Sequence, residues 1–433
     1  MFLHHQWTVR RKKMSKMNQF RLLKIIVMNS LLLLSLTGCW SSHEAEEDAV
    51  IDIMGIDINE QGEYEITASI VKSYQIFSLT SKNSSDEKGE NSFIISATGK
   101  SIVQAISRLA STIPKRLYFG HMNVLVLGNT FASEENLGQG LDYFKRENDF
   151  RPNMQLYVTK GKARDIVRTN PELKPTLGLE IKGMFTTNRY ATSAMVKDLS
   201  KFSEALSSVS TDPYTGVLSS TSANKDLAQK EVVDPNEQGN SKSLTPQENR
   251  EASLSLNETA VFKNGKLVGY LNKEETKGLL WLKGDLVKDV IVAPCGDELG
   301  KGTTSLIIRK VNTSISSQKS DSKIALDVDI HAIGEISEMT CQTPSISSAD
   351  LAKLNLRVES IIKEEINDFL KKTKNEWHTD IVGFGERINR KYTEDWREMA
   401  STWKRNGFKD IDIDINIDFS ITRFGLQKGI TSE

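Results

Sequence analysis

Thiols and imidazoles are the side chains in this 433-residue sequence that could most readily do chemistry, and both are scarce. The sequence holds three cysteines and six histidines, and four of the histidines follow Cys39. None of those four has a second ligand at the spacing of a zinc motif such as HExxH or CxxC. The sequence therefore predicts no bound metal and no cofactor.

Carboxylates and glycines give no better candidate for catalysis. The run Asp412–Asp418 alternates Asp or Asn with Ile, but it lacks the Gly at the sixth and the Glu at the twelfth position of a calcium loop. His331 shares a strand face with Asp327 and Asp329, which is typical of a solvent-facing sheet surface. The pair of glycines in residues 383–385 has no third Gly and no preceding strand, so it is not a nucleotide loop. The absence of a recognisable site predicts a binding or assembly protein, not an enzyme.

Cys39 has the clearest chemical role, because it closes a lipoprotein export signal. A basic stretch precedes a short apolar run, and Leu36, Thr37, Gly38 and Cys39 follow as a lipobox. The apolar run is too short and interrupted to span a bilayer, which takes about 20 residues. A diacylglyceryl group on the thiol supplies two acyl chains, enough for stable anchoring. The alternative is an ordinary secretory signal whose first mature residues include a cysteine.

The distribution of charge supports this assignment. The chain has 56 basic and 57 acidic residues, a net charge of −1, but its first 38 residues contain seven basic residues and no acid. Without those seven, 49 basic residues stand against 57 acidic ones, a net charge of −8. The folded part is thus mildly acidic, which excludes a nucleic-acid binder with a basic surface. The start codon stays open among Met1, Met14 and Met17.

The other two cysteines, Cys295 and Cys341, leave two alternatives open. In an exported protein they can form one disulfide that closes a loop of about 46 residues. They can equally remain two buried free thiols.

Residues 39–48 form a short polar tether, and an amino-terminal α/β domain is expected over residues 49–206. Two runs rich in β-branched residues, 50–58 and 64–71, are separated by a polar turn and predict a β-hairpin. Apolar residues at helical spacing predict a helix near 102–109. Further strands are expected at 117–127 and 154–159, with helices at 133–147 and 163–168. This alternation is typical of an α/β or α+β domain.

Residues 207–252 are dominated by polar side chains and predict a linker or insertion, after which 253–433 form one or more α+β domains. Asn264-Gly265 between two apolar runs predicts a hairpin with a type I′ turn. Strands are expected at 304–311, 323–333 and 410–421. A long helix with a capping box follows Ser347, and two further helices are expected at 381–391 and 393–404.

Several stretches together resemble the Ger(x)C family, the lipoprotein C subunits of GerA-type germinant receptors of endospore-forming bacteria. They run from the lipobox almost to the carboxyl end, and the block over 259–281 is the most specific. The stretches are Leu36-Thr-Gly-Cys39-Trp40, Ile53-Met-Gly-Ile-Asp57, Ser96-Ala-Thr-Gly99, Leu117-Tyr-Phe-Gly-His121-Met-Asn-Val-Leu-Val126, Leu141-Asp-Tyr-Phe-Lys-Arg146, Arg151-Pro152, Thr259-Ala-Val-Phe-Lys-Asn-Gly-Lys-Leu-Val-Gly-Tyr-Leu271, Glu274-Glu-Thr-Lys-Gly-Leu-Leu-Trp281 and Asp380-Ile-Val-Gly-Phe-Gly385, with Tyr392 and Trp396.

The resemblance implies a multidomain α+β protein with mixed β-sheets flanked by helices, after a cleaved signal peptide over residues 1–38. It implies no catalysis. It implies a lipoprotein on the outer face of the spore inner membrane that assembles with two membrane-embedded subunits, the A and B proteins, to respond to nutrient germinants.

Four residues of the matching stretches have no known role: His121, Trp281, Gly383 and Gly385. We expect His121 to be structural, bonded to backbone, and Trp281 to lie in a core. The alternative function is a solute-binding lipoprotein that captures a small nutrient, which requires a deep polar pocket between the two halves.

Overall fold

The computed structural model describes most of the chain beyond the tether. The described residues are 21, 23–30, 47–72, 92–186, 195–220, 254–286, 288–297, 299–320, 323–342 and 347–424. The chain divides into two units, residues 1–48 and 49–433. In the first unit, residues 23–30 are helical. None of the helices in the described part of the chain is both long and apolar enough to cross a membrane.

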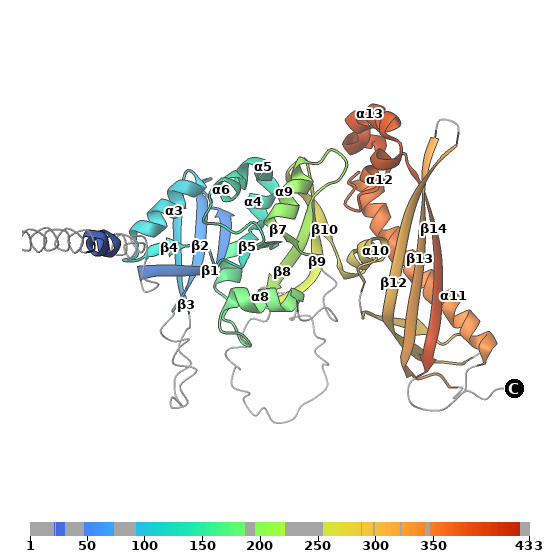
Figure 1. Cartoon of the computed structure of the whole chain (residues 1–433). Coiled ribbons are helices and arrows are strands. Elements are labelled where there is room, and N and C mark those ends of the chain that lie inside the picture. The colour runs from blue at the N-terminus through green and yellow to red at the C-terminus, as the bar shows by residue number, and fades with distance from the viewer. Residues whose placement is uncertain are drawn as a thin grey trace, which may run out of the picture. The chain divides into compact units, whose positions relative to one another are not determined.

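The second unit contains a ten-stranded mixed sheet, in the order β10-β9-β8-β6-β5-β1-β2-β3, with β4 beside β1 and β7 beside β6 (Figure 1). The central strands β1, β5, β6 and β8 are parallel, and the pairs β1–β2, β2–β3, β6–β7, β8–β9 and β9–β10 are antiparallel. Its strands are β1 (Asp48–Ile58), β2 (Tyr64–Val71), β3 (Ser92–Gly99), β4 (Arg116–Tyr118), β5 (Val124–Leu127), β6 (Gln155–Val158), β7 (Lys197–Asp198), β8 (Tyr214–Ser220), β9 (Leu254–Lys263) and β10 (Lys266–Leu271).

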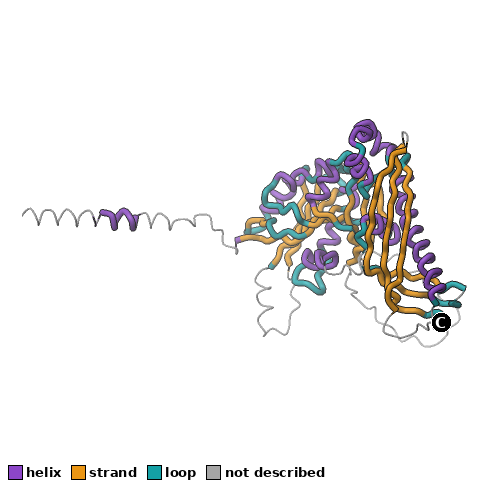
Figure 2. Tube along the Cα trace, turned by 45° about the vertical axis from the view of Figure 1, so that its right-hand side comes forward, coloured by secondary structure: helices purple, strands orange, loops and turns teal. Residues whose placement is uncertain are grey.

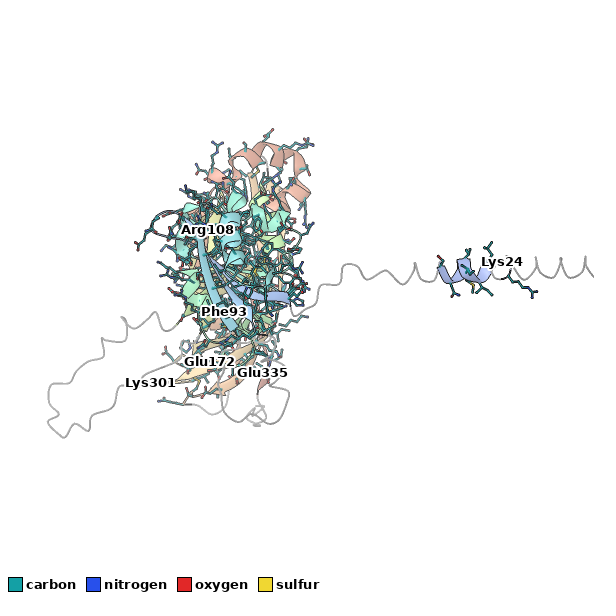
Figure 3. The ribbon with its side chains drawn as sticks, turned by 90° about the vertical axis from the view of Figure 1, so that its left-hand side faces the viewer. Lys24, Phe93, Arg108, Glu172, Lys301 and Glu335 are labelled. Atoms are coloured by element: carbon teal, nitrogen blue, oxygen red, sulfur yellow. A yellow bond between two sulfur atoms is a disulfide. The ribbon has the colours of Figure 1, made fainter. Side chains whose placement is uncertain are left out.

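Helices cover both faces of this sheet. The short strand β5 is buried throughout, because Leu125 and Leu127 belong to one hydrophobic cluster and Val124 and Val126 to another. Strands covered on both faces have continuous apolar runs, as here. The covering helices are α3 (Ile102–Ser111), α4 (Asn129–Glu134), α5 (Leu137–Gly140), α6 (Asp142–Arg146) and α9 (Leu199–Ser207) on one side, and α7 (Ala163–Val167) and α8 (Leu177–Thr186) on the other. Figure 3 looks onto the β3 edge, where Phe93 and Arg108 are labelled.

A second, four-stranded sheet has the order β11-β12-β13-β14. Its strands are β11 (Val290–Pro294), β12 (Thr303–Ser320), β13 (Lys323–Met339) and β14 (Asp412–Phe424). The strands β13 and β14 are parallel, so the chain between them must cross over, and α11 (Ser348–Leu370) makes most of that crossing along one face of the sheet (Figures 1 and 2). Around it lie α10 (Lys273–Lys283), α12 (Phe384–Lys391), α13 (Thr393–Thr402) and two π-helical turns, η3 (Lys371–Glu376) and η4 (Trp403–Gly407).

Mixed sheets flanked by helices confirm the expected α+β class. The predicted β1–β2 hairpin, the helix α3 and the capping box at Ser347 are present. Asn264 and Gly265 both have positive φ (52° and 78°), as a type I′ turn requires. The expected strand over 117–127 is instead β4 and β5 with a turn between them, and the helix expected over 133–147 is broken into short pieces.

The sheet pairing also differs from the expected domain boundaries. Residues 214–220, placed within the linker, form β8 between β6 and β9, and the first five residues of this strand are all buried. The hairpin β9–β10, placed in the carboxyl-terminal half, extends the amino-terminal sheet through β8. Short polar runs with few apolar residues do not reveal a strand whose partners lie far away in the sequence.

Candidate functional site

The lipobox residues Leu36, Thr37, Gly38 and Cys39 lie outside the described residues. Lipidation of Cys39 therefore stays a prediction from the sequence.

Cys295 and Cys341 are joined by a disulfide in the structure, with 1.94 Å between the sulfurs and 5.7 Å between the Cα atoms. Cys295 follows β11 and Cys341 follows β13, so the bond links two strand ends that lie on either side of β12. The bond closes a 46-residue segment at one end of the second sheet.

Trp281 is fully buried at the contact between α10 and α11. Its indole nitrogen donates a hydrogen bond of 2.7 Å to the Glu365 carboxylate. Burial raises the pKa of Glu365 to about 7, although this hydrogen bond and the nearby Lys277 ammonium act in the opposite direction. Trp281 therefore serves the core, and its role is to hold two helices together.

Gly383 and Gly385 belong to a loop that wraps around the carboxylate of Asp380. The backbone N–H groups of Gly383, Phe384 and Gly385 donate to this carboxylate at 2.8, 3.1 and 2.7 Å. Gly383 has a φ of +92°, a conformation that side-chain-bearing residues rarely adopt. At Gly385 a Cβ atom would lie 2.8 Å from the Ser210 carbonyl oxygen. Both glycines are thus explained by the backbone of the loop.

The same loop joins the two halves of the second unit. The Asp380 N–H donates to the Asp212 carboxylate (3.1 Å), and the Asp212 N–H donates to the Asp380 carbonyl (2.7 Å). The Lys404 ammonium lies 3.2 Å from the other Asp212 carboxylate oxygen. Burial raises the pKa of Asp380 to about 6, against the effect of its three N–H donors, and also raises the pKa of Asp212. We call this set of contacts the Asp380 junction.

An open polar pocket of about 310 Å³ lies beside the Asp380 junction, and we call it the junction pocket. The amino-terminal half contributes Lys197 and Tyr214, and the carboxyl-terminal half contributes Lys283 and Glu386. Within the described residues the buried Tyr214 hydroxyl has no hydrogen-bond partner, while both ammonium groups lie over its ring. Burial lowers the pKa of Lys283 to about 8 and also lowers that of Lys197.

A second open pocket, of about 320 Å³, lies where the parallel strands β1, β5 and β6 begin, and we call it the amino-edge pocket. His121 lines it together with the cationic side chains of Arg151 and Lys182. Its single carboxylate is that of Asp52. The ring of His121 is exposed, lies 5.4 Å from that of Tyr118, and makes no hydrogen bond within the described part of the chain. The backbone bond expected for His121 is therefore absent there.

The opposite edge of the same sheet, where open α/β sheets commonly bind ligands, is filled by the protein itself. The Asp57 carboxylate at the end of β1 accepts hydrogen bonds from the N–H groups of Ala163 (2.7 Å) and Arg164 (2.9 Å) at the start of α7. Burial raises the pKa of Asp57. Asp57 thus caps a helix at this edge.

The described residues contain no group of three or more His, Cys, Asp or Glu side chains that could hold a metal ion. His331 lies on β13 beside Asp418 on β14, with 3.1 Å between the Nδ1 and Oδ2 atoms, and both side chains are exposed. This agrees with a solvent-facing sheet surface.

Sequence reasoning missed several residues of these sites. Asp380 and Arg151 stand inside the stretches that carry the family resemblance, and an Asp shortly before Gly-Phe-Gly was a usable signal for a carboxylate that binds loop N–H groups. Lys182 and Lys283 gave no signal, because an isolated lysine on a helix is usually solvated.

The fold and its sites define an α+β protein of two mixed sheets with two open polar pockets. The amino-terminal sequence matches the family model "Spore germination protein N-terminal domain" over residues 41–220, and the carboxyl-terminal sequence matches "Spore germination B3/ GerAC like, C-terminal" over 257–425. The chain belongs to this family of spore germination proteins.

Curated relatives agree over nearly the whole length. The chain is similar to "Spore germination protein KC" of Bacillus subtilis (strain 168), 25% identical over 94% of this chain and 96% of the relative. It is also similar to "Spore germination protein B3" of the same organism, 24% identical over 91% and 96%. Its structure resembles the crystal structure of the GerBC protein, with a TM-score of 0.53, 18% identity, and coverage of 85% of this chain and 96% of that one. At this identity the structural likeness shows the fold.

Proposed function

We propose that the protein is the lipid-anchored C subunit of a nutrient germinant receptor, needed for spore germination as a non-catalytic component of assembly and signalling. The observation that carries the proposal is the order of the matches: both family models follow one another directly behind the lipobox at Cys39.

In this proposal the protein lies on the outer face of the spore inner membrane and assembles with the membrane-embedded A and B subunits. Residues 40–47 separate the anchor from β1, so the start of β1 lies within about 30 Å of the acylated cysteine. Such tethering raises the effective concentration of the folded part beside its membrane partners.

Substitution of the anchor tests this proposal in spores. Cys39→Ala should release the protein from the membrane fraction and impair nutrient germination, because the two acyl chains are lost. Ser41→Ala is the matched control and should fractionate and germinate like wild type. If Cys39→Ala also behaves like wild type, the anchor has no role. Crosslinking in spores should recover the A and B subunits, and recovery of no membrane subunit would overturn the assembly proposal.

The junction pocket favours a second candidate function, capture of a small solute. It is polar and lined from both halves, but it is open, whereas the alternative from the sequence requires a deep pocket. Calorimetry of the purified full chain with amino acids and sugars tests it. Heat of binding that disappears in Tyr214→Phe would favour solute capture, and absence of binding would reject it.

A further inference from the structure

The amino-edge pocket has an excess of positive charge that the protein does not neutralise. Arg151, Lys182 and His121 line it with exposed side chains, and none of them forms an ion pair within the described residues. The carboxylate oxygens of Asp52 accept hydrogen bonds from the Asn123 amide (2.9 Å) and the Gly178 N–H (2.6 Å). One carboxylate that is already hydrogen-bonded thus faces two permanent cations and an imidazole.

These cationic side chains surround an apolar floor. Met122 and Met154 are buried at the starts of β5 and β6, and Val50 lies at the start of β1. Polar groups at the rim and methionines below form a pocket that accepts an anion attached to an apolar body. A free inorganic anion would use only the rim.

Chain connectivity limits how far this pocket can lie from the anchor. Val50 is the third residue of β1, and β1 begins nine residues after Cys39. If Cys39 is acylated, the pocket can reach the bilayer surface, because a nine-residue span is at most about 30 Å long. The carboxyl edge of the sheet, at the far end of β1, is occupied by the Asp57 cap.

An exposed apolar side chain, that of Leu173, lies in the turn before α8. Leu173 is 86% exposed, and its turn is fixed because the Glu180 carboxylate accepts hydrogen bonds from the N–H groups of Glu172, Leu173 and Lys174. Leu179, one residue before Glu180, lines the pocket and is 41% exposed. Glu172 marks this turn in Figure 3. Fixed exposed leucines beside cations are typical of protein surfaces that contact a membrane interface.

We propose that the amino-edge pocket binds the phosphate group of an anionic phospholipid in the membrane that carries the anchor, with Arg151, Lys182 and His121 around the phosphate. Binding would fix which face of the folded part lies on the bilayer. This inference rests on the lipid anchor of the proposed function, and it adds a second, headgroup-specific contact to it.

Hydrogen exchange of the acylated full chain in nanodiscs tests the proposal. The backbone of residues 119–123, 151–154 and 173–182 should exchange more slowly in nanodiscs that contain phosphatidylglycerol than in nanodiscs of phosphatidylcholine alone. The double variant Arg151→Gln with Lys182→Gln should lose this difference, because each cation near an anionic surface contributes about a fivefold gain in binding. Circular dichroism should remain unchanged, since both side chains are exposed.

The matched control is Lys100→Gln with Lys162→Gln, which removes the same charge at the opposite edge of the same sheet. The control should keep the full protection. The proposal is overturned if exchange is slowed equally in both kinds of nanodisc. It is also overturned if the double variant Arg151→Gln with Lys182→Gln keeps the difference between them. Equal protection by millimolar inorganic phosphate without phosphatidylglycerol also overturns it, in favour of a soluble ligand. Failure of the chain to remain with any nanodisc would instead contradict the anchor.

Discussion

The Asp380 junction and the amino-edge pocket both contain residues of the stretches that resemble the family, yet they use them in opposite ways. At the junction, the Asp380 carboxylate accepts three backbone hydrogen bonds and the glycines fit the loop closely. In the pocket, Arg151 and His121 are exposed and form no ion pair within the described residues. The first set is explained by folding, whereas the second requires something outside the chain to explain it.

Removal of the Asp380 carboxylate should have the largest effect on stability. Asp380→Ala leaves three buried N–H groups without an acceptor, at roughly 1–3 kcal/mol each, so we expect a loss of about 5 kcal/mol in the free energy of unfolding. Denaturant unfolding of the full chain measures it. Asp410→Ala, at an exposed carboxylate, is the control and should change little. A loss below about 1 kcal/mol would mean that the hydrogen bonds of the Asp380 junction contribute little to folding.

The disulfide between Cys295 and Cys341 should have the second-largest effect on stability. Cys295→Ala with Cys341→Ala should lower the free energy of unfolding by about 4 kcal/mol, because the closed loop restricts the unfolded chain. Wild type under strong reductant should unfold like the double variant. Mass spectrometry of the non-reduced, alkylated protein checks the bond directly, and two alkylated thiols would reject it.

Glu365, which accepts the hydrogen bond from Trp281, should make the free energy of unfolding depend on pH. Its folded pKa is about 7, against 4.5 for an ordinary glutamate, so between these values the folded state holds a proton that the unfolded state releases. Stability must then fall as the pH rises from about 4.5 to 7, by about 3 kcal/mol. Glu365→Gln should remove this part of the pH dependence, as urea unfolding at several pH values would show. Parallel curves for the variant and wild type would refute the assignment.

A single added methyl group at Gly385 tests how closely the loop of the Asp380 junction is packed. Gly385→Ala would place Cβ 2.6 Å from Trp403 Nε1 and 2.8 Å from the Ser210 carbonyl oxygen, so we expect a loss of about 2 kcal/mol. Gly161→Ala is the matched control, because no atom lies within 4 Å of the added carbon. Thermal unfolding of both variants measures the difference, and equal stability would show that the loop adjusts easily.

The pocket should give the smallest effect on folding. Arg151→Gln with Lys182→Gln should change the free energy of unfolding by less than about 0.5 kcal/mol. Both side chains are exposed, and the 3.3 Å hydrogen bond from the Lys182 ammonium to Asn123 Oδ1 is exposed as well, so they contribute little. The same denaturant measurement applies. A loss comparable to that at the Asp380 junction would show that these cations serve the fold, and the contrast between the two regions would disappear.

Local patterns predicted those elements whose signals lie within the element. Alternation in 50–58 and 64–71 specifies the hairpin, and Asn264-Gly265 specifies a turn. The helix face of α3 is specified by the spacing of Ile102, Ala105, Ile106 and Leu109. Each of these signals depends only on neighbouring residues. The strand β8 escaped prediction because its burial depends on β6 and β9, which are distant in the sequence. The same holds for the amino-edge pocket, which is formed by residues from five separate segments.

The sequence alone determined the acidic character of the folded part, the family resemblance and the α+β class, because each depends on residue types at short range. The export signal with its cysteine stays a prediction from the sequence. Only the tertiary structure decided that Asp380 binds its own loop while Arg151 and Lys182 form no ion pair within the described residues. Whether a charge meets a partner is a matter of distance in space, and sheet pairing sets that distance between segments that sequence order keeps apart.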